Sequence, residues 1–187
     1  MRGAPIRIWL VALSVVIATA LMPGRVSSDS EPPIQAEAAC LINFSRFIKW
    51  PTDAIENPRD PFVIGIFGDN PFGIGLAQMA SAEGRGIEVR SIRTHDDMRT
   101  CRILFIGSAN QKIVTQILAS LNGSSVLTVS DADGFLEWGG MIEFSKRDDR
   151  VHFAVNDMVV KSAGIHASAN LLKLASEVIE RGAVETN

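Results

Sequence analysis

Several features are scarce in this chain of 187 residues, and each scarcity argues against a class of protein. Eighteen Lys and Arg residues against 21 Asp and Glu residues leave no basic excess, which argues against nucleic-acid binding. With 8 Pro and 15 Gly, the chain is neither low-complexity nor fibrous. Two cysteines, Cys40 and Cys101, cannot build a tetrahedral cysteine metal site. What remains is a chain long enough for one globular domain.

The sequence also lacks the common catalytic signatures: a glycine-rich phosphate loop, a GxSxG nucleophile motif and an HExxH zinc motif. Its histidines, His95, His152 and His166, are scattered. Asp131 and Asp133 follow a predicted strand end, where α/β proteins bind ligands. The further acidic ligands of a calcium loop are missing, so turn chemistry is favoured there. We predict no catalytic residue, no metal site and no cofactor, and a binding protein in preference to an enzyme.

The N-terminus has the three parts of a secretory signal. Arg2 and Arg7 precede a run without charge over residues 8–22, a Pro-Gly break and small residues at 26–28. We predict a signal peptide over residues 1–28 and a single exported domain over residues 29–187. An uncleaved membrane anchor is the alternative, although the apolar run is short for a membrane-spanning helix.

Apolar periodicity predicts alternating helices and strands along the rest of the chain. Helices are expected over 36–50, 72–82 and 110–121, and from Ser168 through buried Leu174 and Val178; strands are expected over 62–67, 87–92, 102–107 and 125–130. Segments 141–144 and 151–155 flank a charged tip and predict a hairpin. This order predicts an α/β fold, a three-layer α/β/α sandwich with a mainly parallel sheet and a late antiparallel hairpin.

Three blocks of sequence go beyond these patterns. Residues 38–51 (AACLINFSRFIKWP) are a helix that ends in Trp-Pro, and residues 62–73 (FVIGIFGDNPFG) are a strand followed by a turn. The third block runs from Leu127 through 134–142 and 151–156 to Ala175, and Cys101 leads a further strand. In this order the blocks resemble the YfiR family of bacterial periplasmic proteins, over about residues 36–179.

The resemblance implies a periplasmic, non-enzymatic regulator with a YfiR-like domain. Such a protein binds the periplasmic part of an inner-membrane diguanylate cyclase and represses it, which lowers cyclic di-GMP signalling and biofilm formation. An outer-membrane lipoprotein and a second copy of the chain are further candidate partners. The alternative is a periplasmic small-ligand-binding or accessory protein for an outer-membrane receptor or sensor kinase, which a pocket near Asp69 and Asp131 would support.

The candidate partner-binding residues lie in two parts of the chain. Arg46 and Trp50 belong to the first predicted helix, and Asn156, Ser168 and Leu172 belong to the C-terminal region. Replacing the exposed members by charged residues is expected to abolish repression without lowering the melting temperature. A joint loss of activity and stability would indicate structural residues instead.

The cysteines depart from the family pattern that the resemblance implies. Family members often pair the cysteine equivalent to Cys101 with one in the preceding buried strand, where this sequence has Gly65. A disulfide between Cys40 and Cys101 is one alternative. The others are a buried, reduced Cys101 and a pairing between two chains.

Overall fold

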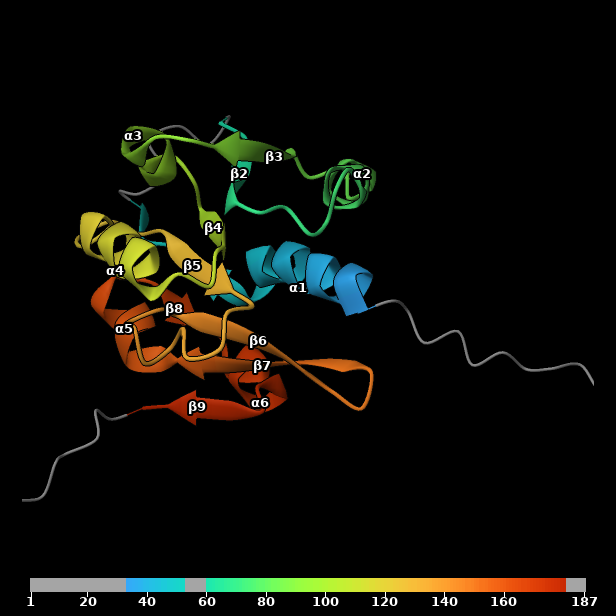
Figure 1. Ribbon diagram of the computed structural model, residues 1–187. Helices are drawn as coiled ribbons and strands as arrows, with labels where there is room; N and C mark the ends of the chain where they lie inside the picture. Colours follow the sequence, from blue (N-terminus) through green and yellow to red (C-terminus); the bar gives the residue numbers. More distant parts are fainter. Residues whose placement is uncertain (1–32, 53–59, 181–187) are drawn as a thin grey trace, which may run out of the picture.

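The protein is built on a seven-stranded sheet with helices on both faces (Figure 1). The structure is a computed structural model, which describes residues 33–52 and 60–180. The predicted three-layer α/β/α sandwich is confirmed. The predicted signal peptide, residues 1–28, lies outside the described residues and stays a prediction. No helix within the described ranges is long and apolar enough to cross a membrane.

The sheet has the strand order β3-β2-β4-β5-β6-β7-β9, and its neighbours are parallel except for the antiparallel pair β6–β7. Its strands are β2 Phe62–Gly68, β3 Ile87–Ile92, β4 Ile103–Gly107, β5 Leu127–Ser130, β6 Ile142–Arg147, β7 Arg150–Asn156 and β9 Glu177–Ile179. A separate two-stranded sheet pairs β1 Ile48–Lys49 with β8 His166–Ala167. The helices are α1 Pro33–Phe47, α2 Gly75–Ala82, α3 His95–Arg99, α4 Gln111–Ser120, α5 Asp157–Ser162 and α6 Ala169–Leu174.

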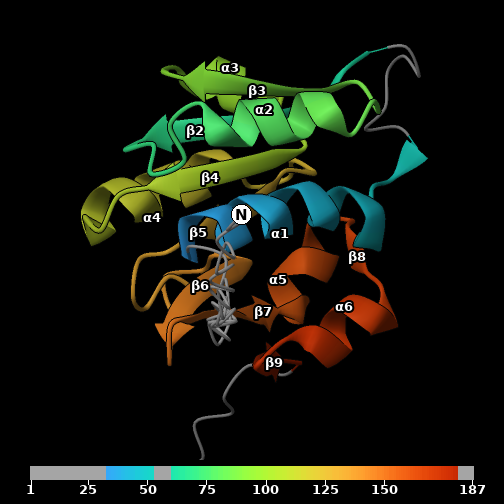
Figure 2. The same cartoon turned by 90° about the vertical axis from the view of Figure 1, so that its right-hand side faces the viewer.

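The sheet separates two apolar cores, because successive side chains of a strand point to opposite faces. In β4, Ile103 and Phe105 join the first core while Leu104 and Ile106 join the second. Helices α1, α2 and α6 cover the first core, and α3 and α4 cover the second (Figures 1 and 2). Helix α5 adds Val160 to the first core. A strand buried on both faces requires the continuous apolar run that identified it in the sequence.

The predicted hairpin is present as β6 and β7, but it does not form the edge of the sheet. Its two tip residues, Asp148 and Asp149, have φ angles of 52° and 56°. Positive φ at both positions is the geometry of a two-residue turn whose twist matches the flanking strands. Strand β9 then pairs in parallel with β7 and takes the edge position.

The C-terminal prediction of one helix through Val178 was wrong. Helix α6 ends at Leu174, and Ala175 adopts an extended conformation with ψ near 140°. The Ser176 backbone N–H then donates to the Phe153 carbonyl at 2.8 Å, so the chain leaves the helix to join the sheet. As a result Leu174, predicted to be buried, is 68% exposed.

Helix α2 begins three residues later than predicted, for a local reason. The Asn70 side chain accepts a hydrogen bond from the Phe72 backbone N–H at 3.0 Å, and Gly73 has a φ of 53°. A positive φ cannot continue into a right-handed helix, so this segment forms a turn. The turn buries Phe72 against Phe105, with ring centroids 4.8 Å apart.

Candidate functional site

The fold brings together the two distant regions predicted to contact a partner. Strand β1, directly after α1, pairs with β8 through Ile48 with Ala167 and Lys49 with His166. The Ser168 backbone N–H also donates to the Phe47 carbonyl at 2.9 Å. The end of α1 therefore lies beside the start of α6, although about 120 residues separate them in sequence (Figure 2).

Two of the predicted residues, Arg46 and Trp50, lie at the α1 end of this junction. Arg46 forms an ion pair with Glu83 at the end of α2, and 47% of its side chain remains exposed. Trp50 is half-buried and packs edge-to-face on Phe62 with a centroid distance of 5.2 Å. Its buried indole N–H has no hydrogen-bond partner among the described residues. Arg46 is accessible to a partner, whereas Trp50 mainly packs the domain.

The other three predicted residues have structural tasks. The Asn156 side chain caps α5 by accepting from the Val159 backbone N–H at 3.2 Å. The Ser168 hydroxyl caps α6 by accepting from the Leu171 backbone N–H at 3.3 Å. Leu172 is half-buried against the first core. Caps satisfy backbone donors that a helix leaves open, which explains these residue types without a partner.

Sequence reasoning missed the most exposed apolar side chain of this region. Leu174 is 68% exposed on α6, two residues after Leu172. Together with Arg46 and the exposed Lys49 and His166, these two leucines define what we call the α1–α6 face. The exposure of Leu174 follows from the end of α6 at this residue, and the sequence pattern did not predict that end.

The two cysteines lie in different cores. Cys40 is on α1 and packs against the first core, while Cys101 is buried in the second core on the opposite face of the sheet. A bridge between them within one chain would have to cross the sheet, so the fold disfavours it. Their pairing stays a prediction. Burial raises the pKa of the Cys101 thiol to about 11, with a smaller opposing effect of the Thr100 side chain. A buried thiol of this kind is unreactive, which fits the buried, reduced alternative for Cys101.

A carboxylate is buried in the first half of α1. Glu37 is fully buried, and its only ion pair among the described residues joins its Oε1 to the Lys146 Nζ on β6 at 3.1 Å. Loss of solvation raises the pKa of Glu37, and the hydrogen bond and charge of Lys146 only partly oppose this, while Asp131 adds to the rise. Burial therefore disfavours the charged form of Glu37.

Glu37→Gln is expected to raise the free energy of unfolding at pH 7, and to raise it by less at pH 4. With its pKa raised, Glu37 holds its proton more tightly in the folded than in the unfolded state. The free energy of unfolding of the native chain therefore falls as pH rises from the ordinary carboxyl value of about 4.3 through the folded pKa. Urea unfolding at the two pH values measures the difference.

Glu88→Gln is the matched control for that experiment. Glu88 is exposed, and hydrogen bonding from Arg90 lowers its pKa, so its linkage to pH has the opposite sign. Equal changes in both variants, or a gain for Glu37→Gln that grows toward pH 4, would contradict the role assigned to burial.

The segment after β5 is built from turn interactions. The Ser130 hydroxyl donates to the Ile106 carbonyl at 2.7 Å and accepts from the Ala132 backbone N–H at 3.2 Å. Gly134 has a φ of 81°, and Asp131 and Asp133 are exposed. Within residues 33–52 and 60–180, no cluster of three His, Cys, Asp or Glu side chains is placed to hold a metal ion.

Comparison with solved structures shows the same fold at low sequence identity. An ABC domain from Streptococcus pneumoniae in complex with L-Trp has a TM-score of 0.51 and 11% identity, over 80% of this chain and 62% of that one. A conserved domain protein from Vibrio cholerae has a TM-score of 0.50 and 11% identity, over 79% of this chain and 60% of that one. The chain thus spans about three fifths of the length of these structures. At this identity the likeness extends to the fold alone.

Comparison with family models is more specific. The YfiR/HmsC-like model matches residues 34–176, which include α1, the α1–α6 face and every sheet strand except β9. The match also spans the blocks that resembled the YfiR family in the sequence. The chain therefore belongs to the YfiR/HmsC-like family of periplasmic regulatory proteins.

Proposed function

We propose that this protein binds the periplasmic part of an inner-membrane diguanylate cyclase and holds it inactive, lowering cyclic di-GMP and biofilm formation. The observation that carries the proposal is the family match over residues 34–176. Repression of this kind needs no catalytic centre. The repressor shifts the cyclase toward its inactive state because it binds that state more tightly than the active one.

The α1–α6 face is the surface we propose for the cyclase. It includes one exposed leucine, Leu174, and the exposed side chains of Arg46, Lys49 and His166. Protein interfaces combine an apolar centre with a polar rim, and arginine is enriched in them. The β1–β8 pairing holds the end of α1 beside the start of α6, so a partner can contact both regions at once.

Deleting the gene in its native host is expected to raise intracellular cyclic di-GMP, and restoring it is expected to reverse the rise. A restored gene that lacks residues 1–28 serves as the control, because the proposed site of action is the periplasm. The truncated protein should be synthesised, but the level of cyclic di-GMP should stay high. An unchanged nucleotide level on deletion, in cells where the exported protein is detected, would contradict repression.

A second function, binding of a small ligand, is favoured by one observation. A cavity of about 670 Å³ opens at the amino ends of the central strands. The pocket expected for this function near Asp69 and Asp131 would lie at the opposite, carboxyl ends. Ligand binding and repression are compatible in one regulator.

A further inference from the structure

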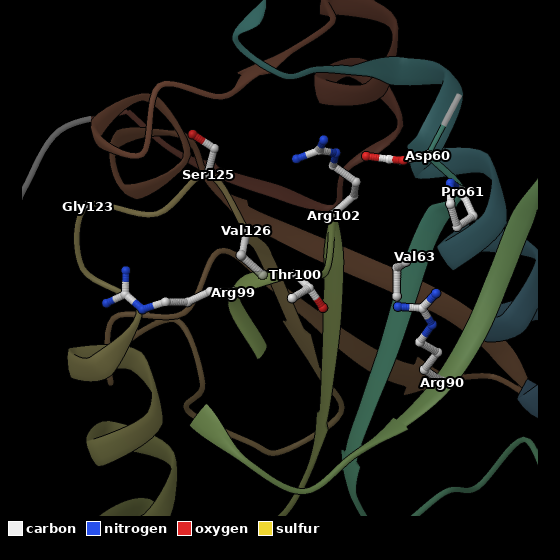
Figure 3. A pocket seen from close by; sticks show the side chains of 10 residues that line it. All are labelled: Asp60, Pro61, Val63, Arg90, Arg99, Thr100, Arg102, Gly123, Ser125 and Val126. Carbon is white, nitrogen blue, oxygen red and sulfur yellow. The ribbon is translucent and has the colours of Figure 1, made fainter. Parts of the chain in front are cut away.

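The cavity of about 670 Å³ lies where β2, β4 and β5 begin (Figure 3). Three arginines line it from different elements: Arg90 on β3, Arg99 at the end of α3 and Arg102 before β4. Asp60 is the one acidic side chain among the described residues of the lining, and Figure 3 shows its carboxylate on the side of Arg102. The described part of the lining therefore has a net positive charge, although the chain as a whole has a net charge of −3.

The three arginines differ in how far they are neutralised. Arg90 is paired with Glu88 through two hydrogen bonds of 2.8 and 2.7 Å. Arg99 donates to the backbone carbonyl of Ser120, which carries no charge. The half-buried Arg102 has no side-chain hydrogen bond or ion pair with any described residue. A partly desolvated guanidinium that forms no ion pair is unfavourable for the domain alone, which points to an anion as its missing partner.

The remaining lining restricts the chemistry of that anion. The Thr100 and Ser125 hydroxyls already donate to the carbonyls of Asp97 and Ala163, at 2.7 and 3.0 Å. The guanidinium groups of Arg99 and Arg102 are therefore the main side-chain donors left for a ligand. Guanidinium groups bind the paired oxygens of carboxylates and phosphates through two parallel hydrogen bonds.

The floor of the cavity is apolar. Figure 3 shows Val63 and Val126 between the arginines, and both valines are buried. The volume falls within the range of small-molecule sites, about 300–1,000 Å³. The cavity can thus hold a molecule with a short carbon frame as well as its charged groups.

We propose that this cavity binds a small organic anion with at least two carboxylate or phosphate groups. Two separated oxyanion groups match the separation of the Arg99 and Arg102 guanidinium groups, which Figure 3 shows on different sides of Val126. The arginines outnumber Asp60 in the described lining, so their attraction for a ligand with more than one negative charge exceeds the repulsion from Asp60. This inference goes beyond the proposed function, since it holds whichever protein the domain regulates.

The test is isothermal titration of the mature protein, purified from the periplasm, with citrate and with pyrophosphate at physiological salt. One-site binding of either probe is expected. Tighter binding of citrate would indicate recognition of carboxylates, and tighter binding of pyrophosphate would indicate recognition of phosphates. Arg102→Gln should weaken that binding by about tenfold or more. It should not lower the melting temperature, because Arg102 has no side-chain hydrogen bond or ion pair to lose among the described residues.

Arg93→Gln is the matched control, because Arg93 is exposed between β3 and α3 and does not line the cavity. It should leave the affinity unchanged. The proposal is overturned if neither probe binds at millimolar concentration, or if Arg102→Gln binds as tightly as the native chain. It is also overturned if Arg93→Gln weakens binding as much as Arg102→Gln, which would indicate general charge attraction.

Discussion

A Gly65→Cys variant is expected to form a disulfide bond with Cys101 and to become more stable when oxidised. A Cβ atom placed on Gly65 would lie 2.5 Å from the Cys101 Sγ, so the two residues are immediate neighbours in the second core. A new thiol at position 65 therefore has Cys101 as its natural partner once either sulfur rotates. This is the pair of positions that family members were expected to bridge.

The expected gain is large because the bridge closes a long loop. Joining positions 65 and 101 encloses about 36 residues, and the loss of unfolded-state entropy corresponds to about 4 kcal/mol. Urea unfolding of the variant with and without reductant measures this difference. Peptide mapping under oxidising conditions should find residues 65 and 101 linked, with Cys40 outside the bridge. A link to Cys40, or an oxidised form no more stable than the reduced one, would contradict the geometry.

Gly65→Ala is the control that isolates packing. The added methyl group would meet the Cys101 Sγ at 2.5 Å and the Ile92 Cγ1 at 2.7 Å, which is too close for either atom. Overpacking of this kind costs about 1–3 kcal/mol of unfolding free energy. The native glycine thus gives Cys101 the room to stay a thiol, and this member of the family keeps the position without the bridge.

Leu174→Asp is expected to abolish repression of the cyclase while leaving the melting temperature unchanged. Leu174 is 68% exposed in the isolated domain, so the substitution removes no buried contact. A charge in the centre of a protein interface must lose its water on binding, which weakens the complex by at least about 2 kcal/mol, or thirtyfold in Kd. Cyclic di-GMP in the complemented deletion strain reports the loss of repression, and thermal unfolding reports stability.

Ile74→Asp provides a matched control. Ile74 is 74% exposed but lies in the turn before α2, outside the α1–α6 face. It should keep full repression, since a surface substitution of this kind changes stability by about 0.5 kcal/mol or less. Loss of repression by Ile74→Asp alone would move the interface to α2. Equal loss in both variants would show an effect of charge in general.

The strands of the sheet were predictable because a strand buried on both faces needs a continuous run of apolar residues. Residues 62–67 and 103–107 are short apolar runs, and they form β4 and most of β2. The short helices α3 and α5 have no such pattern, since five and six residues cannot show helical periodicity. The Thr94 cap, which accepts from the Asp97 backbone N–H at 3.2 Å, is the local signal that identifies α3.

The two regions of the candidate site came from the sequence, and their role in binding a partner stays a prediction. The end of α1 and the C-terminal region were both named from sequence, and β1 and β8 hold them together. The individual residues were harder to predict. Asn and Ser are typical both of helix caps and of polar contacts with a partner, and in the structure Asn156 and Ser168 cap helices. The arginines of the cavity lie on separate elements, so only the fold brings them together.

The position of α1 has a consequence for how the chain folds as it is made. The buried side of α1, with Leu41 and Phe44, packs in one core with Phe153, Val160 and Leu171. Contacts so distant in sequence form late, because the intervening chain must first be gathered. A nascent chain therefore cannot close this core until nearly all of it has been synthesised. That delay would keep the chain loosely structured, as the export directed by the predicted signal peptide would require.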